Sequence, residues 1–334
     1  MRTCSEKSGR STSVRPTNSS ICDVPGIVAG HAGDRESLTG VTVVRCDAGA
    51  VVGVDVRGAA PATRETDLCR PGTLVEQANA IVLAGGSAFG LAAADGVMQC
   101  LHELGLGFVA GSVRVPIVPA ACIFDLGIGA PVWPDADMGR AACAGATGDP
   151  LAEGCVGAGL GATVGKALGH DLATKSGVGT SSLRCGSATV GALVVVNALG
   201  DVVLPKSGMI VAGARSVESG GFAGTEEILL RGAAMAGPGE NTTIGVVATD
   251  APLSPDGADY LARVAHDGLA RVIRPVHTMA DGDTMFALAT GALKGEAPTL
   301  MAVGVAAVLA VEQAIVRAVA AAEPMGGLPA ARMP

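Results

Sequence analysis

The chain has 334 residues, of which 49% are hydrophobic and 16% charged, with a net charge of −8 at pH 7. This length and composition allow a large buried core in one large domain or two ordinary ones. The acidic charge disfavours nucleic acid and anionic membranes as partners. An aromatic content of 2% also argues against a base-stacking surface for single-stranded nucleic acid.

The N-terminal residues and the cysteines indicate the cellular compartment that we expect for the protein. Residues 1–20 are rich in Ser, Thr and Arg and lack the apolar core of a secretory signal, so we expect a disordered tail before a single domain at 21–334. The nine cysteines contain no Cys-x-x-Cys pair, which favours reduced thiols in a cytoplasmic protein. The longest apolar run, Leu300–Val311, is too short to span a bilayer and predicts a buried helix.

Hydrophobic patterning predicts elements along the first half of the chain. Two β-branched runs separated by Asp47-Ala48-Gly49 are interpreted as a hairpin that follows a glycine-rich segment at 23–34. The expected elements are strands 40–46, 50–57, 78–84, 107–110 and 117–125, a helix ending near 104, and a short helix at 137–145.

The second half begins with a glycine-dense stretch, 154–191, in which only the start of one strand is assigned. Ser254 and Pro255 are the N-cap and first position of a predicted helix. The expected elements are strands 188–199, 243–249 and 284–290, and helices 225–235, 255–271 and 298–322. Strands adjacent in sequence favour a layered α/β fold with mainly antiparallel or mixed sheets over a doubly wound fold.

One stretch has an unusual order of residues. The breaker Ala236-Gly237-Pro238-Gly239 is followed by Glu240, Asn241 and two threonines that lead directly into an apolar strand. We hypothesise that the peptide bond Asn241–Thr242 cuts itself. Thr242 would then be an N-terminal residue whose hydroxyl is the nucleophile and whose amine is the base.

The remaining motifs are weak when taken singly. The glycine run 157–162 departs from the dinucleotide fingerprint, and no histidine has metal-ligand spacing. Asp281-Gly282-Asp283 is typical of a solvated turn, with a cation loop as the alternative. Lys166 is either a surface lysine or a cation that lowers the pKa of a nearby amine. Asn197 is either a turn residue or a donor to an oxyanion.

Taken together, five segments resemble the DmpA family of self-processing peptidases and amidases. That family includes L-aminopeptidase/D-esterase enzymes, β-aminopeptidases, pantetheine hydrolase and nylon-oligomer hydrolase. The resemblance covers about residues 23–322, in segments that occur in the family's order. The matching segments are Leu83–Leu91, Gly154–Lys166, Gly191–Gly200, Asn241–Leu253 and Pro275–Gly291.

The resemblance implies a four-layer αββα fold, similar to Ntn hydrolases but connected differently. It also implies one cut into an α chain, 1–241, and a β chain, 242–334, a homo-oligomer such as a tetramer, and no metal or organic cofactor. By position it implies Thr242 as nucleophile, Asn241 as the residue released at the cut, Lys166 beside the nucleophile, Asn197 on the oxyanion side, Asp281 and Asp283 as an acidic pair, and Ser87, Phe89 and Phe124 as substrate contacts.

The resemblance also limits the range of substrates that we expect. The β-aminopeptidases have Gly-Ser at the cut and Ser at the first acidic position, whereas this chain has Asn-Thr and Asp-Gly-Asp. The chain is therefore more similar to the threonine branch. The expected reaction is hydrolysis of short peptides or amino-acid amides through an acyl-enzyme. An endo-amidase acting on ω-amino acid oligomers is the alternative, and a non-enzymatic small-molecule binding protein is a third reading.

Overall fold

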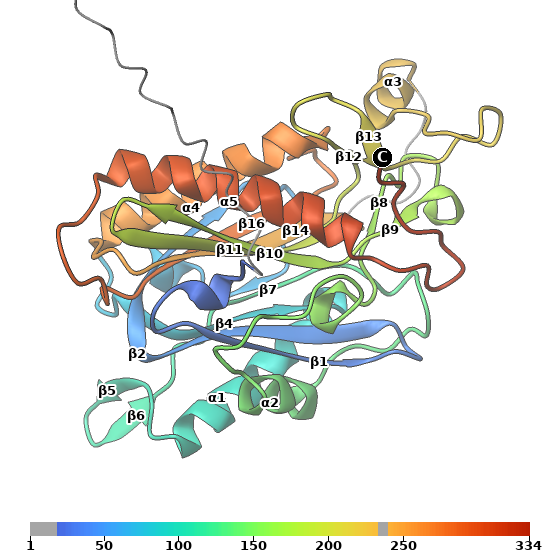
Figure 1. Ribbon diagram of the computed structural model, residues 1–334. Helices are drawn as coiled ribbons and strands as arrows, with labels where there is room; N and C mark the ends of the chain where they lie inside the picture. Colours follow the sequence, from blue (N-terminus) through green and yellow to red (C-terminus); the bar gives the residue numbers. More distant parts are fainter. Residues whose placement is uncertain (1–18, 233–239) are drawn as a thin grey trace, which may run out of the picture.

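Helices lie on both outer faces of the molecule and enclose two layers of β-strands. The computed structural model describes residues 19–232 and 240–334 and shows these layers edge-on (Figure 1). One outer layer contains α4 (Pro255–Val272) and α5 (Leu300–Ala320), and the other contains α1 (Ala93–Glu103) and α2 (Ala136–Ala144). The four-layer arrangement expected from the sequence is confirmed.

The strands under α4 and α5 position the functional residues discussed below. Their order is β10 (Val178–Cys185), β11 (Ala188–Asn197), β14 (Thr242–Thr249) and β16 (Thr284–Ala289). β14 is antiparallel to β11 and parallel to β16, so the sheet is mixed, as predicted. Val194 and Val196 of β11 face the helices, whereas Leu193 and Val195 face the second strand layer, as the two-residue period of a strand requires.

The long strand β2 (Thr39–Val56) joins the two strand layers. Its first half pairs with β1 (Val28–Asp34) and β4 (Gln77–Ala84), and its second half pairs with β16. The second layer continues from β4 through β7 (Ala120–Cys122) to β3 (Thr63–Arg64).

The hairpin predicted for 40–46 and 50–57 is wrong. Asp47-Ala48-Gly49 does not reverse the chain but shifts the register of β2 against β4 between Arg45 and Ala50. Gly49 has a φ of +79°, the left-handed conformation that a glycine supplies at a bulge. The two runs form one strand because each has partners in a different part of the sheet.

Three apolar clusters fill the spaces between the four layers. The first packs α4 and α5 on β11, β14 and β16, and the second lies between the two strand layers. The third packs α1 and α2 against β2 and β4. Glycine lets layers approach closely: a Cβ on Gly53 of β2 would lie 2.3 Å from the backbone of Ala258 in α4.

Most long elements agree with the predicted ranges to within about three residues at each end. Ser254 accepts a hydrogen bond from the N–H of Gly257, with Pro255 at the start of α4, so the predicted cap is confirmed. α5 is apolar and long enough to cross a membrane by length and composition, but its buried face packs on β10 and β11. The predicted buried helix is therefore confirmed.

Short elements were mostly missed, and parts of two predictions cannot be compared. Residues 1–18 of the expected tail and 233–235 of the expected helix 225–235 lie outside the described residues; within them that helix is α3 (Thr225–Leu230). The predicted strand 117–125 shortens to β7. The missed strands are β3, β10, β6 (Val113–Val115), which pairs with β5 (Phe108–Ala110), β8 (Thr163–Val164), β9 (Thr174–Lys175), β12 (Asp201–Val203), β13 (Ile210–Ala212) and β15 (Ile273–Arg274).

Candidate active site

The sheet order brings distant segments to one strand edge. Because β11 and β14 are antiparallel, Asn197 at the end of β11 lies opposite Thr242 at the start of β14. Because β14 and β16 are parallel, the residues just before β16 reach the same edge, and Asn241 forms a bridge with Asp281. Lys166 follows β8, whose Thr163 N–H donates to Asn197 Oδ1 at 3.0 Å.

Asn241 and Thr242, the residues on either side of the predicted cleavage bond, are both buried. The side chain of Thr242 is held against its own preceding peptide, with Oγ1 donating to the Asn241 carbonyl oxygen at 2.5 Å. The same carbonyl accepts the N–H of Gly282 at 2.8 Å. A hydroxyl beside a carbonyl that already has a second donor is placed for nucleophilic attack on that carbonyl.

Lys166 is a buried lysine next to the segment that contains the Asn241–Thr242 peptide. Its Nζ donates to the Asn197 carbonyl at 2.9 Å, to Asn197 Oδ1 at 3.0 Å and to the Glu240 carbonyl at 3.0 Å. Three acceptors match the three donors of an ammonium group. Burial lowers the pKa of Lys166 to about 7, against the opposing charges of Asp281 and three other carboxylates. Lys166 therefore changes charge near neutral pH, unlike an exposed lysine.

Asn197 connects the Glu240 peptide to the second strand layer. Its Oδ1 accepts from Lys166, and its Nδ2 donates to the Phe124 carbonyl at 3.0 Å and the Glu240 carbonyl at 3.3 Å. The Asn197 amide is therefore already engaged by the peptides next to Asn241. The donor that reaches the Asn241 carbonyl besides Thr242 is the N–H of Gly282.

Asp281 and Asp283 flank Gly282 and are both buried. Asp283 Oδ1 accepts the N–H of Thr243 at 2.7 Å, which fixes the backbone next to Thr242. Burial, and then the charge of Asp283, raise the pKa of Asp281. The solvated turn favoured by the residues alone is wrong, because the loop is buried against Asn241 and the peptides of 57–60.

Of the predicted substrate contacts Ser87, Phe89 and Phe124, the structure places Phe124 at this edge, and the role of all three stays a prediction. The Phe124 carbonyl contacts Asn197, and the next residue, Asp125, accepts the N–H of Gly86 at 2.6 Å. Ser87, which has a φ of +55°, follows Gly86. Phe89 points outward, is 58% exposed and stacks on Trp133 at 4.5 Å between ring centroids. Trp133 was not predicted.

The sequence did not predict several further residues that contact the candidate active site. Gly282 supplies a backbone donor, and the only signal was a glycine between two aspartates. Glu240 contributes its carbonyl, and its carboxylate pairs with His170 Nε2 at 2.8 Å. His277 and Thr278 contact the acidic pair through hydrogen bonds that no spacing rule predicts.

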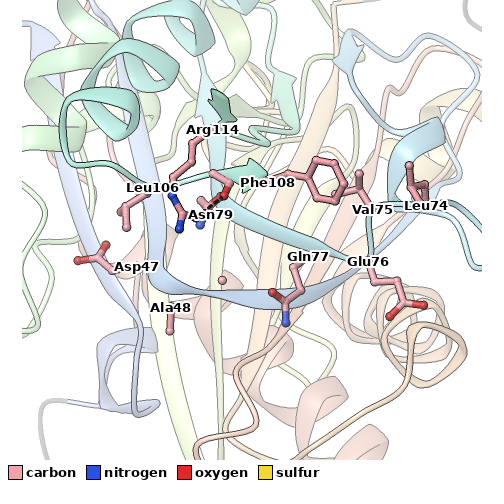
Figure 2. A pocket seen from close by; sticks show the side chains of 12 residues that line it. Asp47, Ala48, Leu74, Val75, Glu76, Gln77, Asn79, Leu106, Phe108 and Arg114 are labelled. Atoms are coloured by element: carbon pink, nitrogen blue, oxygen red, sulfur yellow. Dashed lines mark hydrogen bonds between the residues drawn. The ribbon is translucent and has the colours of Figure 1, made fainter. Parts of the chain in front are cut away.

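Thr242 and Lys166 are both buried, at 3% and 2% exposed. An open pocket of about 380 Å³ lies elsewhere, where Asn79, Gln77, Phe108 and Arg114 come together (Figure 2). It lies at the start of β4, the strand whose other end leads to Gly85 and Gly86. In the part of the chain that the structure describes, no group of three or more His, Cys, Asp or Glu could hold a metal ion.

Comparisons with known proteins identify a family and several relatives. The model of "Peptidase family S58" matches residues 19–332. A protein of Mycobacterium bovis named as an uncharacterized aminopeptidase is 45% identical over 343 residues, covering 94% of this chain and 97% of the relative. A 6-aminohexanoate-oligomer endohydrolase of Kocuria sp. is 33% identical over 273 residues, covering 80% of this chain and 74% of the relative.

A solved structure shows the same fold. The L-aminopeptidase D-Ala-esterase/amidase of Ochrobactrum anthropi, described as a variant of the Ntn hydrolase fold, superposes with a TM-score of 0.69. The superposition covers 93% of this chain and 88% of that chain at 22% sequence identity. The match covers all four layers, so the fold class expected from the sequence is confirmed.

Proposed function

The chain belongs to peptidase family S58, the DmpA family, and is a hydrolase of peptide or amide bonds; from this premise we propose that Thr242 is its nucleophile and is released by self-cleavage after Asn241. One observation carries the proposal: Thr242 Oγ1 lies against the Asn241 carbonyl in a buried site beside Lys166. The site residues and the cut are our inference from the family resemblance together with this geometry.

Self-cleavage starts in the uncut chain. Thr242 Oγ1 attacks the carbonyl carbon of Asn241, and the developing oxyanion accepts the N–H of Gly282, which already donates to that oxygen at 2.8 Å. The proton of Oγ1 passes to the nitrogen of Thr242, the C–N bond breaks, this nitrogen leaves as an amine, and Asn241 is left as an ester on Oγ1. Water hydrolyses the ester and frees the α chain, 1–241, from the β chain, 242–334.

In the cut enzyme the new α-amine of Thr242 is the base. Its reference pKa of about 7.7–8.0 lets it accept a proton near neutral pH. It takes the proton of Oγ1 as this oxygen attacks the substrate carbonyl, and it returns the proton to the leaving amine. The acyl group remains as an ester on Thr242 until water hydrolyses it. The same oxygen, Oγ1 of Thr242, is the attacking hydroxyl and then the ester oxygen.

Lys166 and Asn197 support the amine. The positive charge of Lys166 repels a second positive charge nearby, which keeps the Thr242 amine neutral and basic. Departure of Glu240 and Asn241 with the α-chain end frees the Asn197 Nδ2 donor now bound to the Glu240 carbonyl. That donor then serves the oxyanion of the substrate. Asp281 and Asp283 orient Asn197 and Thr242 through the backbone: Asp281 faces the N–H of Leu199 just after β11, and Asp283 accepts the N–H of Thr243 in β14.

N-terminal sequencing of the purified protein tests the cut directly. We expect two fragments, with the smaller one beginning Thr242-Thr243-Ile244. A single intact chain with amide-hydrolase activity would show that the cut is not part of the mechanism. An intact chain without activity would favour the reading as a small-molecule binding protein.

The substrate class is best assigned by comparing the rates of hydrolysis of two classes of amide. We propose an aminopeptidase on short peptides or amino-acid amides, and this is supported by the relative of Mycobacterium bovis that covers almost the whole chain. Amino-acid p-nitroanilides are therefore expected to be hydrolysed at least about tenfold faster, by kcat/KM, than 6-aminohexanoate oligomers. The reverse order would assign the endo-amidase activity instead.

The assembly and compartment are further proposals. We propose a homo-oligomer, such as a tetramer of cut units, in the cytoplasm. The eight cysteines in the described part of the chain are all free thiols, which supports a reducing compartment.

A further inference from the structure

Two consecutive residues supply four hydrogen bonds to the acidic pair. The backbone N–H and Oγ1 of Thr278 donate to Asp281 Oδ2 at 2.8 and 2.6 Å. The backbone N–H and Nδ1 of His277 contact Asp283 Oδ2 at 3.2 and 2.8 Å. Each residue therefore holds one oxygen of one carboxylate with two donors, and we name His277 and Thr278 the carboxylate clamp.

The backbone of His277 makes this arrangement possible. Its φ of +55° lies in the left-handed region, which histidine and asparagine enter more readily than most residues. In this conformation the main-chain N–H and the ring nitrogen of one residue reach the same carboxylate oxygen. The ring is only partly exposed and lies edge-on against His266 of α4, 4.8 Å between centroids. A neighbouring element therefore fixes its orientation.

The clamp leaves the opposite oxygen of each carboxylate facing the catalytic strands. Asp283 Oδ1 accepts the N–H of Thr243 at 2.7 Å, one residue after the nucleophile. Asp281 Oδ1 faces the N–H of Leu199 at 3.5 Å, two residues after Asn197. Each carboxylate therefore connects the clamp to the backbone beside a predicted catalytic residue.

We propose that His277 and Thr278 are positioning residues that hold the acidic pair aimed at the edge where Thr242, Asn197 and Lys166 meet. The inference rests on the function proposed above, because it gives the acidic pair a task at that edge. It adds two residues that act through the carboxylates and do not touch the reacting atoms.

Electrostatics explains why the pair needs such a clamp. Burial and the neighbouring charge of Asp283 raise the pKa of Asp281, and the two hydrogen bonds from Thr278 lower it. The charge of Asp281 is in turn the leading charge that raises the pKa of Lys166 against burial. Glu240, Asp125 and Asp283 act on Lys166 in the same direction, and Asp55 and Arg57 lie near His266 behind His277. Weakening the clamp should therefore discharge Asp281 first.

A titration that needs no catalysis tests the clamp. In a Thr242→Ala background, the Asp281 carboxyl signal is followed by ¹³C NMR with and without Thr278→Val, which removes one donor and keeps the side-chain shape. We expect its apparent pKa to rise by about one unit, since a hydrogen bond to a charged group has this magnitude. Thr278→Ser should restore the value. Equal values in the Val and Ser variants would overturn the proposal, whether or not the chain cuts itself.

The pH dependence of hydrolysis gives the functional readout. With the cut enzyme, protonation of the Thr242 amine sets the first fall of kcat on the acidic side. Thr278→Val should start a second, steeper fall, caused by protonation of Asp281, about one pH unit higher than in the wild type and should leave KM within about twofold. Thr249→Val is the matched control, because it removes a buried threonine hydroxyl that donates to the Thr189 carbonyl at the far end of β14. This control should keep the wild-type profile. A profile in Thr278→Val that matches the control would overturn the proposal.

His277 is tested by a pair of variants that both tolerate a left-handed backbone. His277→Gly removes the ring donor and should lower kcat by about tenfold. His277→Asn keeps a side-chain N–H near the position of Nδ1 and should recover most of that loss. Equal rates in the two variants, with both proteins folded, would show that the ring only fills space.

Discussion

Thr242→Ala is expected to give one uncut chain of 32.7 kDa without hydrolytic activity. The variant removes the oxygen that lies against the Asn241 carbonyl, and no other hydroxyl contacts that carbonyl in the described residues. The hydrogen bonds of Lys166, Asn197 and the acidic pair do not involve the Thr242 side chain. The fold should therefore persist, and the loss in kcat should reach the detection limit, as for removal of other catalytic nucleophiles.

A denaturing gel and fragment sequencing separate the outcomes of this experiment. Thr242→Ser keeps a hydroxyl at the same position and should still cut, although its missing methyl group changes the packing. Two fragments from Thr242→Ala would contradict the proposal. If the new fragment began at Thr243, whose buried hydroxyl has no hydrogen-bond partner among residues 19–232 and 240–334, the nucleophile would lie one residue further along. Thermal denaturation of the uncut variant shows whether the fold has survived.

The sequence predicted the strands around the site well because their patterns are strong. β11, β14 and β16 are continuous apolar runs bounded by polar residues, which is typical of strands buried on both faces. β2 was misread because Asp47-Ala48-Gly49 has turn chemistry, although the flanking runs pair with different strands. β10 was missed because Val178–Cys185 contains glycine, threonine and two serines, so it lacks the apolar run of a buried strand. The small residues are explained by the close packing of α5 on this strand.

The sequence predicted the side chains of the candidate site but not the backbone groups around them. Lys166, Asn197, Thr242 and the acidic pair were named from a family resemblance, since their separation in sequence gives no distance. The strand order then brings them to one edge. The clamp and Gly282 act through backbone groups and a left-handed turn, which leave little trace in a single sequence. Side chains with obvious chemistry could be proposed, whereas the groups that orient them required the structure.

Gly282→Ala is expected to slow self-cleavage by at least about a hundredfold, the loss typical of removing one oxyanion donor. Gly282 N–H donates to the Asn241 carbonyl at 2.8 Å. An added Cβ would lie 2.8 Å from Thr242 Oγ1 and 2.5 Å from the Ala60 carbonyl oxygen. One of these atoms must move, because real Cβ atoms do not approach so closely. Either movement separates the nucleophile from the carbonyl or withdraws the donor.

Pulse-chase of the uncut chain gives the rate, with Gly148→Ala as the matched control. Gly148 is exposed, and an added Cβ there meets nothing within 4 Å, so its variant should cut at the wild-type rate. If Gly282→Ala is folded by thermal denaturation and also cuts at that rate, the N–H of Gly282 is not the oxyanion donor of the first step. That task would then fall to Asn197 Nδ2, which would have to leave the Glu240 carbonyl before the bond breaks. If the rate falls as expected, the acidic loop acts through the glycine between its carboxylates as well as through the carboxylates themselves.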